Sequence, residues 1–256
     1  MKRIFMLAGL CSVLLAGCQT AEVKPSPDLL RVGVTPNARP LIFKQDGKIS
    51  GIEADFARKL AEALGRKLVF IEVPWEKQLD YLEQNRTDII MSGMSVTTAR
   101  SIRINFAKPY MQSGLTALFR REKYDPAGLP ASCVLNQRRV GYVKGTTSEI
   151  FVFQQFPQSE KKGFEDVVQG AEALKNKRID MLVYDAPVIW WQYAMDENEF
   201  KAFPQLLNVE PLAWGISRQN PALLEQVNAL ISQWEKDGTA RTIIQRWIPF
   251  LQHPAR

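Results

Sequence analysis

The sequence has little of what several classes of protein require. Its 256 residues include three cysteines and one histidine, too few for a disulfide framework or a zinc-like centre. The lone histidine, at position 253, also nearly excludes histidine-based catalysis. Lysine and arginine exceed the acids to give a net charge of +6, but they are scattered and form no basic run or recognition helix. We therefore expect no metal, no cofactor and no nucleic-acid partner.

Long hydrophobic runs are absent except near the start of the sequence, where residues 4–15 are largely apolar. This run follows two basic residues, is too short to span a bilayer comfortably and is typical of a secretory signal. It ends in Leu15-Ala16-Gly17-Cys18, which resembles the cleavage site of bacterial lipoproteins. We predict a signal peptide over residues 1–17 and a lipidated Cys18 that opens a polar tether over residues 18–28. A soluble-secretion signal with an incidental cysteine is the alternative.

The rest of the sequence predicts an α/β protein with two lobes. Hydrophobic residues make up 46% of the sequence, an ordinary share for a globular protein, and the length suits one large domain or two lobes. Strand-like runs alternate with amphipathic helical patterns in two series, which is typical of α/β sheets. The strands are predicted at residues 30–34, 67–73 and 88–91 in the first series, and at 140–143 and 181–184 in the second. A strongly amphipathic helix follows Pro221 and is expected to end at Gly238.

A polar segment that includes Gly93, Ser95, Thr97 and Arg100 directly follows the predicted strand at residues 88–91. It therefore lies at the carboxyl end of a strand, the edge of an open α/β sheet that usually faces a ligand. Hydroxyl groups, backbone N–H groups and one guanidinium suit a carboxylate, which arginine grips with two charge-assisted hydrogen bonds. In the alternative interpretation, the hydroxyls cap a helix and Arg100 is a solvated surface charge.

Two further segments follow strands of the second series. Thr146 and Thr147 precede a helix, and Glu149 stands three residues after Thr146, as in a capping box. The same helix N-terminus could also bind an anion. Asp185 ends a strand two residues before Pro187, where it either caps the next helix or pairs with a ligand ammonium. The guanidinium of Arg100 suits a carboxylate, and the carboxylate of Asp185 suits an ammonium. A ligand that carries both groups is an α-amino acid.

An ordered set of short motifs covering about residues 29–250 resembles one known family. The motifs are Gly51-Ile52-Glu53-Ala54-Asp55, Thr97-Thr98-Ala99-Arg100, Phe106-Ala107-Lys108-Pro109-Tyr110, Gly145-Thr146-Thr147, and Asp180 with Asp185. They resemble the bacterial extracellular solute-binding proteins of family 3, which serve polar amino-acid transport. The resemblance implies a type II periplasmic-binding-protein fold, with two α/β lobes joined by two hinge crossings. The implied division is a first lobe over residues 29–112 and 211–256, and a second lobe over 113–210.

The resemblance also implies roles for individual residues. Arg100 would hold the α-carboxylate of the ligand, with help from Ser95 and from Thr147 of the other lobe. Asp185 would take the α-ammonium. Thr97 and Thr146 complete the polar part of the predicted site.

Two positions depart from the pattern of the family. Many relatives carry an aromatic residue that stacks on the ligand side chain where this sequence has Ala38, so the side-chain subsite is expected to be larger or to receive Trp75 from the opposite wall. Gly93 replaces a hydroxyl residue, so one ligand hydrogen bond is expected to come from the backbone.

The predicted function is that of a monomeric substrate-binding lipoprotein. It would capture an amino acid or a close analogue in the periplasm or cell envelope, anchored to the membrane through Cys18, and deliver it to the permease of an ABC importer. One alternative is a secreted enzyme on the same fold, similar to cyclohexadienyl or prephenate dehydratases, with Glu149 or Asp185 as its acid. Another is a sensory protein that presents its liganded form to a membrane receptor.

Overall fold

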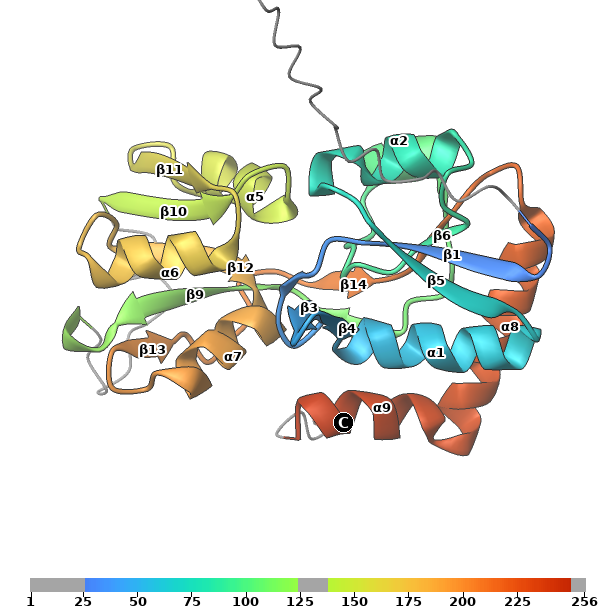
Figure 1. The fold of residues 1–256 in the computed structure, drawn as a ribbon. Coiled ribbons are helices and arrows are strands. Elements are labelled where there is room, and N and C mark those ends of the chain that lie inside the picture. The colour runs from blue at the N-terminus through green and yellow to red at the C-terminus, as the bar shows by residue number, and fades with distance from the viewer. Residues whose placement is uncertain (1–25, 124–137, 250–256) are drawn as a thin grey trace, which may run out of the picture.

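Two α/β lobes lie side by side in the computed structural model, which describes residues 26–123 and 138–249 (Figure 1). Each lobe is built around a five-stranded sheet. The sheet of the first lobe has the order β5 (Lys67–Glu72), β1 (Leu29–Val34), β6 (Ile89–Ile90), β15 (Gly215–Ile216) and β7 (Asn105–Phe106). That of the second lobe has the order β11 (Glu160–Phe164), β10 (Arg139–Val143), β12 (Met181–Asp185), β9 (Leu115–Arg120) and β13 (Phe200–Ala202). The prediction of two α/β lobes is confirmed.

Helices cover both faces of the first sheet. Helix α1 (Ile52–Leu64) packs on one face with α8 (Pro221–Asp237) and α9 (Thr239–Trp247), and α2 (Gln78–Glu83) lies on the other (Figure 1). Leu30, Val32 and Val34 of β1 are fully buried, as expected for a strand that pairs in parallel with a neighbour on each side. The helix ends follow the sequence, because α1 and α8 both stop at a left-handed glycine, Gly65 and Gly238.

The second sheet is likewise enclosed by helices. Met181 and Val183 of β12 pack with Val152 of α5 (Thr147–Gln155), whereas Leu182 faces the opposite side, where α6 (Val167–Lys175) and α7 (Ala186–Met195) lie. This alternation is the two-residue period of a strand with both faces buried. Strand β9 runs antiparallel to both of its neighbours, β12 and β13.

Two antiparallel strands connect the lobes, β8 (Met111–Ser113) and β14 (Glu210–Leu212). Figure 1 shows β14 between the two sheets. Gly114 follows β8 where a side chain would collide with the backbone carbonyl of Asn208, so the close approach of the two crossings requires glycine here.

Smaller elements complete the described chain. A three-stranded sheet has the order β2 (Asn37–Ala38), β3 (Ile42–Gln45) and β4 (Lys48–Ser50), with Asp46 and Gly47 at positive φ in the turn. The short helices are η1 (Trp75–Lys77), α3 (Thr98–Arg103) and η2 (Arg121–Lys123). Over the described ranges, no helix has the length and apolar character needed to cross a bilayer. The predicted lipidation site, Cys18, lies outside these ranges.

Candidate functional site

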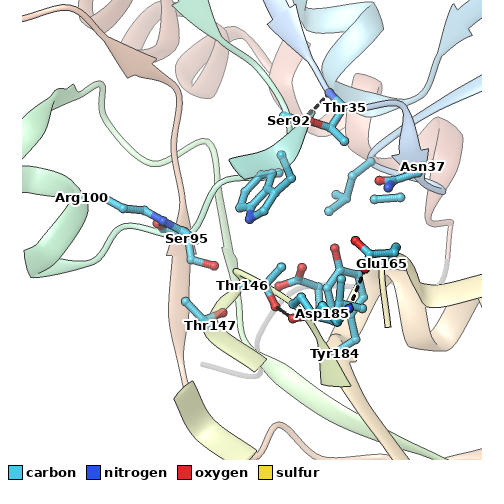
Figure 2. Close-up of a pocket in the computed structure, with 16 residues that line it drawn as sticks. Thr35, Asn37, Ser92, Ser95, Arg100, Thr146, Thr147, Glu165, Tyr184 and Asp185 are labelled. Atoms are coloured by element: carbon cyan, nitrogen blue, oxygen red, sulfur yellow. Dashed lines mark hydrogen bonds and ion pairs between the residues drawn. The ribbon is translucent and has the colours of Figure 1, made fainter. Parts of the chain in front are cut away.

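A pocket lies between the lobes and is lined from both of them (Figure 2). Its walls come from the segments after β1, β6, β10 and β12, which are the carboxyl ends of parallel strands. The predicted residues that line it are Trp75, Gly93, Ser95, Arg100, Thr146, Thr147 and Asp185. Thr97 does not line it, because its hydroxyl caps α3 by accepting a hydrogen bond from the N–H of Arg100 at 3.2 Å. The structure thus shows the helix cap at Thr97, and its role toward a ligand stays a prediction.

Arg100 is a largely buried cation without an acidic partner. Its Nη1 donates to the backbone carbonyl of Ser95 at 2.9 Å, and its guanidinium carbon lies 5.1 Å from the centre of the Trp75 ring. Within the described part of the chain, no carboxylate oxygen lies within 4.0 Å of the guanidinium. Burial lowers the pKa of Arg100, against the opposing effect of Asp185 and Glu210. Arginine stays charged despite such a shift, so the pocket contains a positive charge that the protein leaves unpaired.

Asp185 is the matching buried anion. It precedes α7 but makes no capping bond from its side chain, so the helix-cap interpretation is wrong for this residue. Its carboxylate accepts no hydrogen bond from the described residues, and Oδ1 is buried without a partner. Burial raises the pKa of Asp185 to about 7, with a further contribution from Glu210 and an opposing one from Arg100. Burying a carboxylate without hydrogen-bond donors costs folding free energy, so the Asp185 carboxylate can bind a donor or a cation that enters the pocket.

The two threonines at the start of α5, Thr146 and Thr147, have separate partners. The Thr146 hydroxyl donates to the carbonyl of Val143 at 2.7 Å, and the Glu149 carboxylate accepts from the N–H of Gly145 at 2.6 Å. The capping box predicted between Thr146 and Glu149 is therefore wrong, because the glutamate reaches one residue further back. The Thr147 hydroxyl donates to Oε2 of Glu210 at 2.7 Å.

Gly93 lines the pocket with its backbone. Its φ of +66° lies in the left-handed region, and a side chain there would also collide with Leu41. The backbone conformation and the packing therefore account for glycine at this position without any contact to a ligand. The Gly93 N–H donates to Oε1 of Glu53 at 2.7 Å, so this N–H is not the free ligand donor that the sequence suggested. The fully buried Glu53 also accepts from the Tyr110 hydroxyl at 2.8 Å and from Nε1 of Trp214 at 2.7 Å. Burial raises the pKa of Glu53 to about 7 in spite of these three bonds.

Trp75 links the two lobes directly. Its Nε1 donates to the carbonyl of Gly145 at 2.7 Å, and its side chain lines the pocket. Ala38 and Leu41 form an apolar wall from the same lobe as Trp75. The replacement of an aromatic side chain by Ala38 therefore leaves Trp75 as the aromatic lining residue of the first lobe within the described ranges.

Several lining residues lie outside the predicted segments: Thr35, Asn37, Leu41, Val143 and Glu165. Ser92, Lys144 and Tyr184 also line the pocket and stand in the predicted segments, although no role was assigned to them. Thr35, Lys144 and Glu165 each come directly after a parallel strand, so the rule that identified Arg100 would also have identified them. Lys144 and Glu165 pair at 2.6 Å, and both side chains are largely exposed. Over residues 26–123 and 138–249, no group of three or more histidine, cysteine or acidic residues is arranged to hold a metal ion.

Comparison with known proteins gives a consistent result. The chain is 25% identical over 227 residues to the L-cystine-binding protein of Escherichia coli (strain K12), covering 88% of this chain and 84% of that protein. It is 25% identical over 262 residues to the ABC transporter arginine-binding protein 1 of the same organism, covering 97% and 100%. Among solved structures, an ancestral amino-acid-binding protein described as a precursor of cyclohexadienyl dehydratase superposes with a TM-score of 0.79 at 30% identity, covering 86% of this chain and 95% of that one.

These similarities confirm the predicted type II periplasmic-binding fold and the prediction of a binding protein rather than an enzyme. The model of one family matches residues 30–250, which is most of the chain. The chain belongs to the bacterial extracellular solute-binding proteins, family 3.

Proposed function

We propose that this protein binds a free α-amino acid in the pocket between its lobes and delivers it to the permease of an ABC importer. The observation that carries the proposal is the pair of unpaired charges, Arg100 from the first lobe and Asp185 from the second. Unpaired buried charges are destabilising, and the carboxylate and ammonium of one amino acid would satisfy both. The relatives named for L-cystine and arginine bind ligands of this class.

Each part of the ligand has a counterpart in the pocket. The α-carboxylate pairs with Arg100 and accepts a hydrogen bond from the Ser95 hydroxyl, and the α-ammonium pairs with Asp185. The Thr147 hydroxyl adds a second hydrogen bond to the α-carboxylate when it exchanges Glu210 for the ligand. The side chain of the ligand lies toward the apolar wall and Trp75. Thr146 contributes to the lining, although its hydroxyl is already engaged with Val143. Because Arg100 and Asp185 belong to different lobes, binding stabilises the closed form, which the permease can distinguish from the open one.

The remaining predictions belong to the same proposal. The lobes divide at residues 29–112, 113–210 and 211–256, so that the first lobe is discontinuous. The protein acts as a monomer, held at the membrane of the cell envelope by a lipid on Cys18. The support for this anchor is the lipoprotein-like sequence Leu15-Ala16-Gly17-Cys18 and the extracellular character of the family.

A thermal-shift screen of the purified protein tests the proposed ligand class. The common amino acids and prephenate are added singly, and calorimetry follows for each hit. A ligand that binds only the folded protein must raise its melting temperature. We expect stabilisation by at least one amino acid that is recovered unchanged. No stabilisation by any of them, or consumption of prephenate, would refute the proposal.

A further inference from the structure

Glu210 begins the second crossing strand and holds a carboxylate directly behind the pocket wall. Oε2 accepts from the Thr147 hydroxyl at 2.7 Å, and Oε1 accepts from Nδ2 of Asn208 at 2.7 Å. Asn208 in turn accepts from the N–H of Leu115, next to the first crossing, at 2.7 Å. Both carboxylate oxygens are therefore fixed, one by a residue that lines the pocket and the other by the hinge.

This arrangement occupies a donor that the ligand would use. The Thr147 hydroxyl is buried, lines the pocket and has a single hydrogen, which points to Glu210. A ligand carboxylate can accept that hydrogen only by displacing Glu210. The Glu210 carboxylate thus accepts the hydrogen bond that a ligand carboxylate would otherwise accept from Thr147. Arg100 also interacts with Glu210.

The charged residues around the pocket also disfavour a second carboxylate on the ligand. Lys144 and Glu165 neutralise each other, and Arg100 balances one acid. Asp185 and Glu210 are both acids, and they are close enough for Glu210 to raise the pKa of Asp185. With Asp185 ionised, the site therefore has an excess of one negative charge, in a closed setting where a further like charge is strongly disfavoured.

We propose that Glu210 is a specificity-determining residue, which excludes acidic amino acids and leaves the site selective for neutral and cationic ones. This inference rests on the proposed function, because it concerns the ligand of the same pocket. Glu210 selects through its charge, which repels the second carboxylate of an acidic amino acid, because the Thr147 hydroxyl that it holds serves the α-carboxylate common to all amino acids.

The test compares the wild-type protein with Glu210→Gln. The new amide can donate to the Thr147 oxygen, which frees the hydroxyl hydrogen for a ligand and removes one negative charge. Calorimetry measures dissociation constants for glutamine, glutamate and lysine. Glu225→Gln, on an exposed position of α8, is the matched control.

We expect the affinity for glutamate relative to glutamine to rise about tenfold in Glu210→Gln and to stay unchanged in the control. Lysine should bind more weakly to Glu210→Gln than to the wild type. An unchanged glutamate-to-glutamine ratio, or wild-type protein that binds glutamate as tightly as glutamine, would overturn the proposal.

A second readout needs no ligand and separates this inference from the proposed function. The carboxyl group of Asp185 is titrated by NMR in the ligand-free proteins. Glu210→Gln should lower its midpoint, and the control should leave it in place, because Glu210 and Arg100 are the charged residues that act on Asp185 and Glu225 is not one of them. An unmoved midpoint overturns the inference even if amino acids bind. If no amino acid binds, the proposed function fails, while this titration still decides whether Glu210 sets the charge of the pocket.

Discussion

Glu53 of the first lobe and Asp185 of the second are both buried acids, and their surroundings differ in one respect. Burial is the largest cause of the raised pKa in each case, about 7 for both. Glu53 accepts hydrogen bonds from Gly93, Tyr110 and Trp214, whereas Asp185 accepts none from the described residues. The fold itself satisfies the first acid, and only an entering group can satisfy the second. Burial and pKa are similar for both acids, so it is the absence of hydrogen-bond donors that distinguishes Asp185 as the binding residue.

The largest expected effect comes from Asp185→Asn. This change removes the charge that pairs with the α-ammonium, and losing one partner of a buried charge pair costs about 2–5 kcal/mol of binding free energy. The folding stability of the ligand-free protein should not fall, because no hydrogen bond of the fold is lost. Calorimetry and thermal unfolding measure the two quantities. Wild-type affinity in this variant would remove the distinction between the two acids.

The ligand affinity should also depend on pH through Asp185. An ammonium pairs with the ionised form, and a pKa of about 7 leaves this carboxyl mostly protonated at pH 5. Affinity should therefore rise from pH 5 to pH 8, by up to about a hundredfold, and then level off. Calorimetry across this range measures the profile. Asp185→Asn should flatten it, and a profile that persists in the variant would assign the titration to another group.

The stability of the ligand-free protein should change with pH in the opposite direction. The usual pKa values are 4.5 for Glu53 and 3.8 for Asp185, and both are raised in the folded state. The folded protein therefore binds more protons than the unfolded one between about pH 4 and pH 7, so stability falls as the pH rises through this window. Unfolding in denaturant at several pH values measures the slope. A steeper slope in either acid-to-amide variant would contradict this assignment.

Glu53→Gln should affect folding more than binding. All three partners of Glu53 donate hydrogen bonds to it. The amide nitrogen of glutamine would face one of these donors and leave a buried group unsatisfied, which lowers the free energy of unfolding by about 1–3 kcal/mol. Denaturant unfolding measures the loss. The matched comparison is Asp185→Asn, which makes the same chemical change at an acid without donors. Equal losses of stability in the two variants would show that the hydrogen bonds do not distinguish the acids.

The smallest expected effect is that of Trp75→Phe. The change removes the bond from Nε1 to the carbonyl of Gly145 but keeps an aromatic ring beside Arg100. A single hydrogen bond of this kind contributes about 1 kcal/mol, so ligand affinity should fall by roughly fivefold. A loss as large as that of Asp185→Asn would mean that contact between the lobes, rather than charge pairing, dominates binding.

The sequence predicted those parts of the structure that depend on local pattern. Strands β1, β5, β6, β10 and β12, and the helix end at Gly238, follow from hydrophobic spacing and from the conformational freedom of glycine. Arg100 and Asp185 could be found because each follows a strand at the edge that faces the other lobe. That rule depends on sheet topology, which alternating strands and helices already indicate.

The long-range hydrogen bonds could not be predicted in the same way. Glu53 meets partners 40, 57 and 161 residues away along the chain, and Trp75 bonds a carbonyl 70 residues away. No local pattern encodes such pairs. The same limit explains the error at Glu149, where a capping-box motif was consistent with two backbone partners and the folded backbone selects the N–H of Gly145.

The most direct test of the central claim is a calorimetric titration of the best amino-acid ligand beside two blocked derivatives of it. The α-amide removes the negative charge that pairs with Arg100, and the N-acetyl derivative removes the positive charge that pairs with Asp185. If the pocket recognises both ends of a zwitterion, both derivatives should bind at least about a hundredfold more weakly than the free amino acid. Undiminished binding of either derivative would contradict the assignment of the corresponding residue.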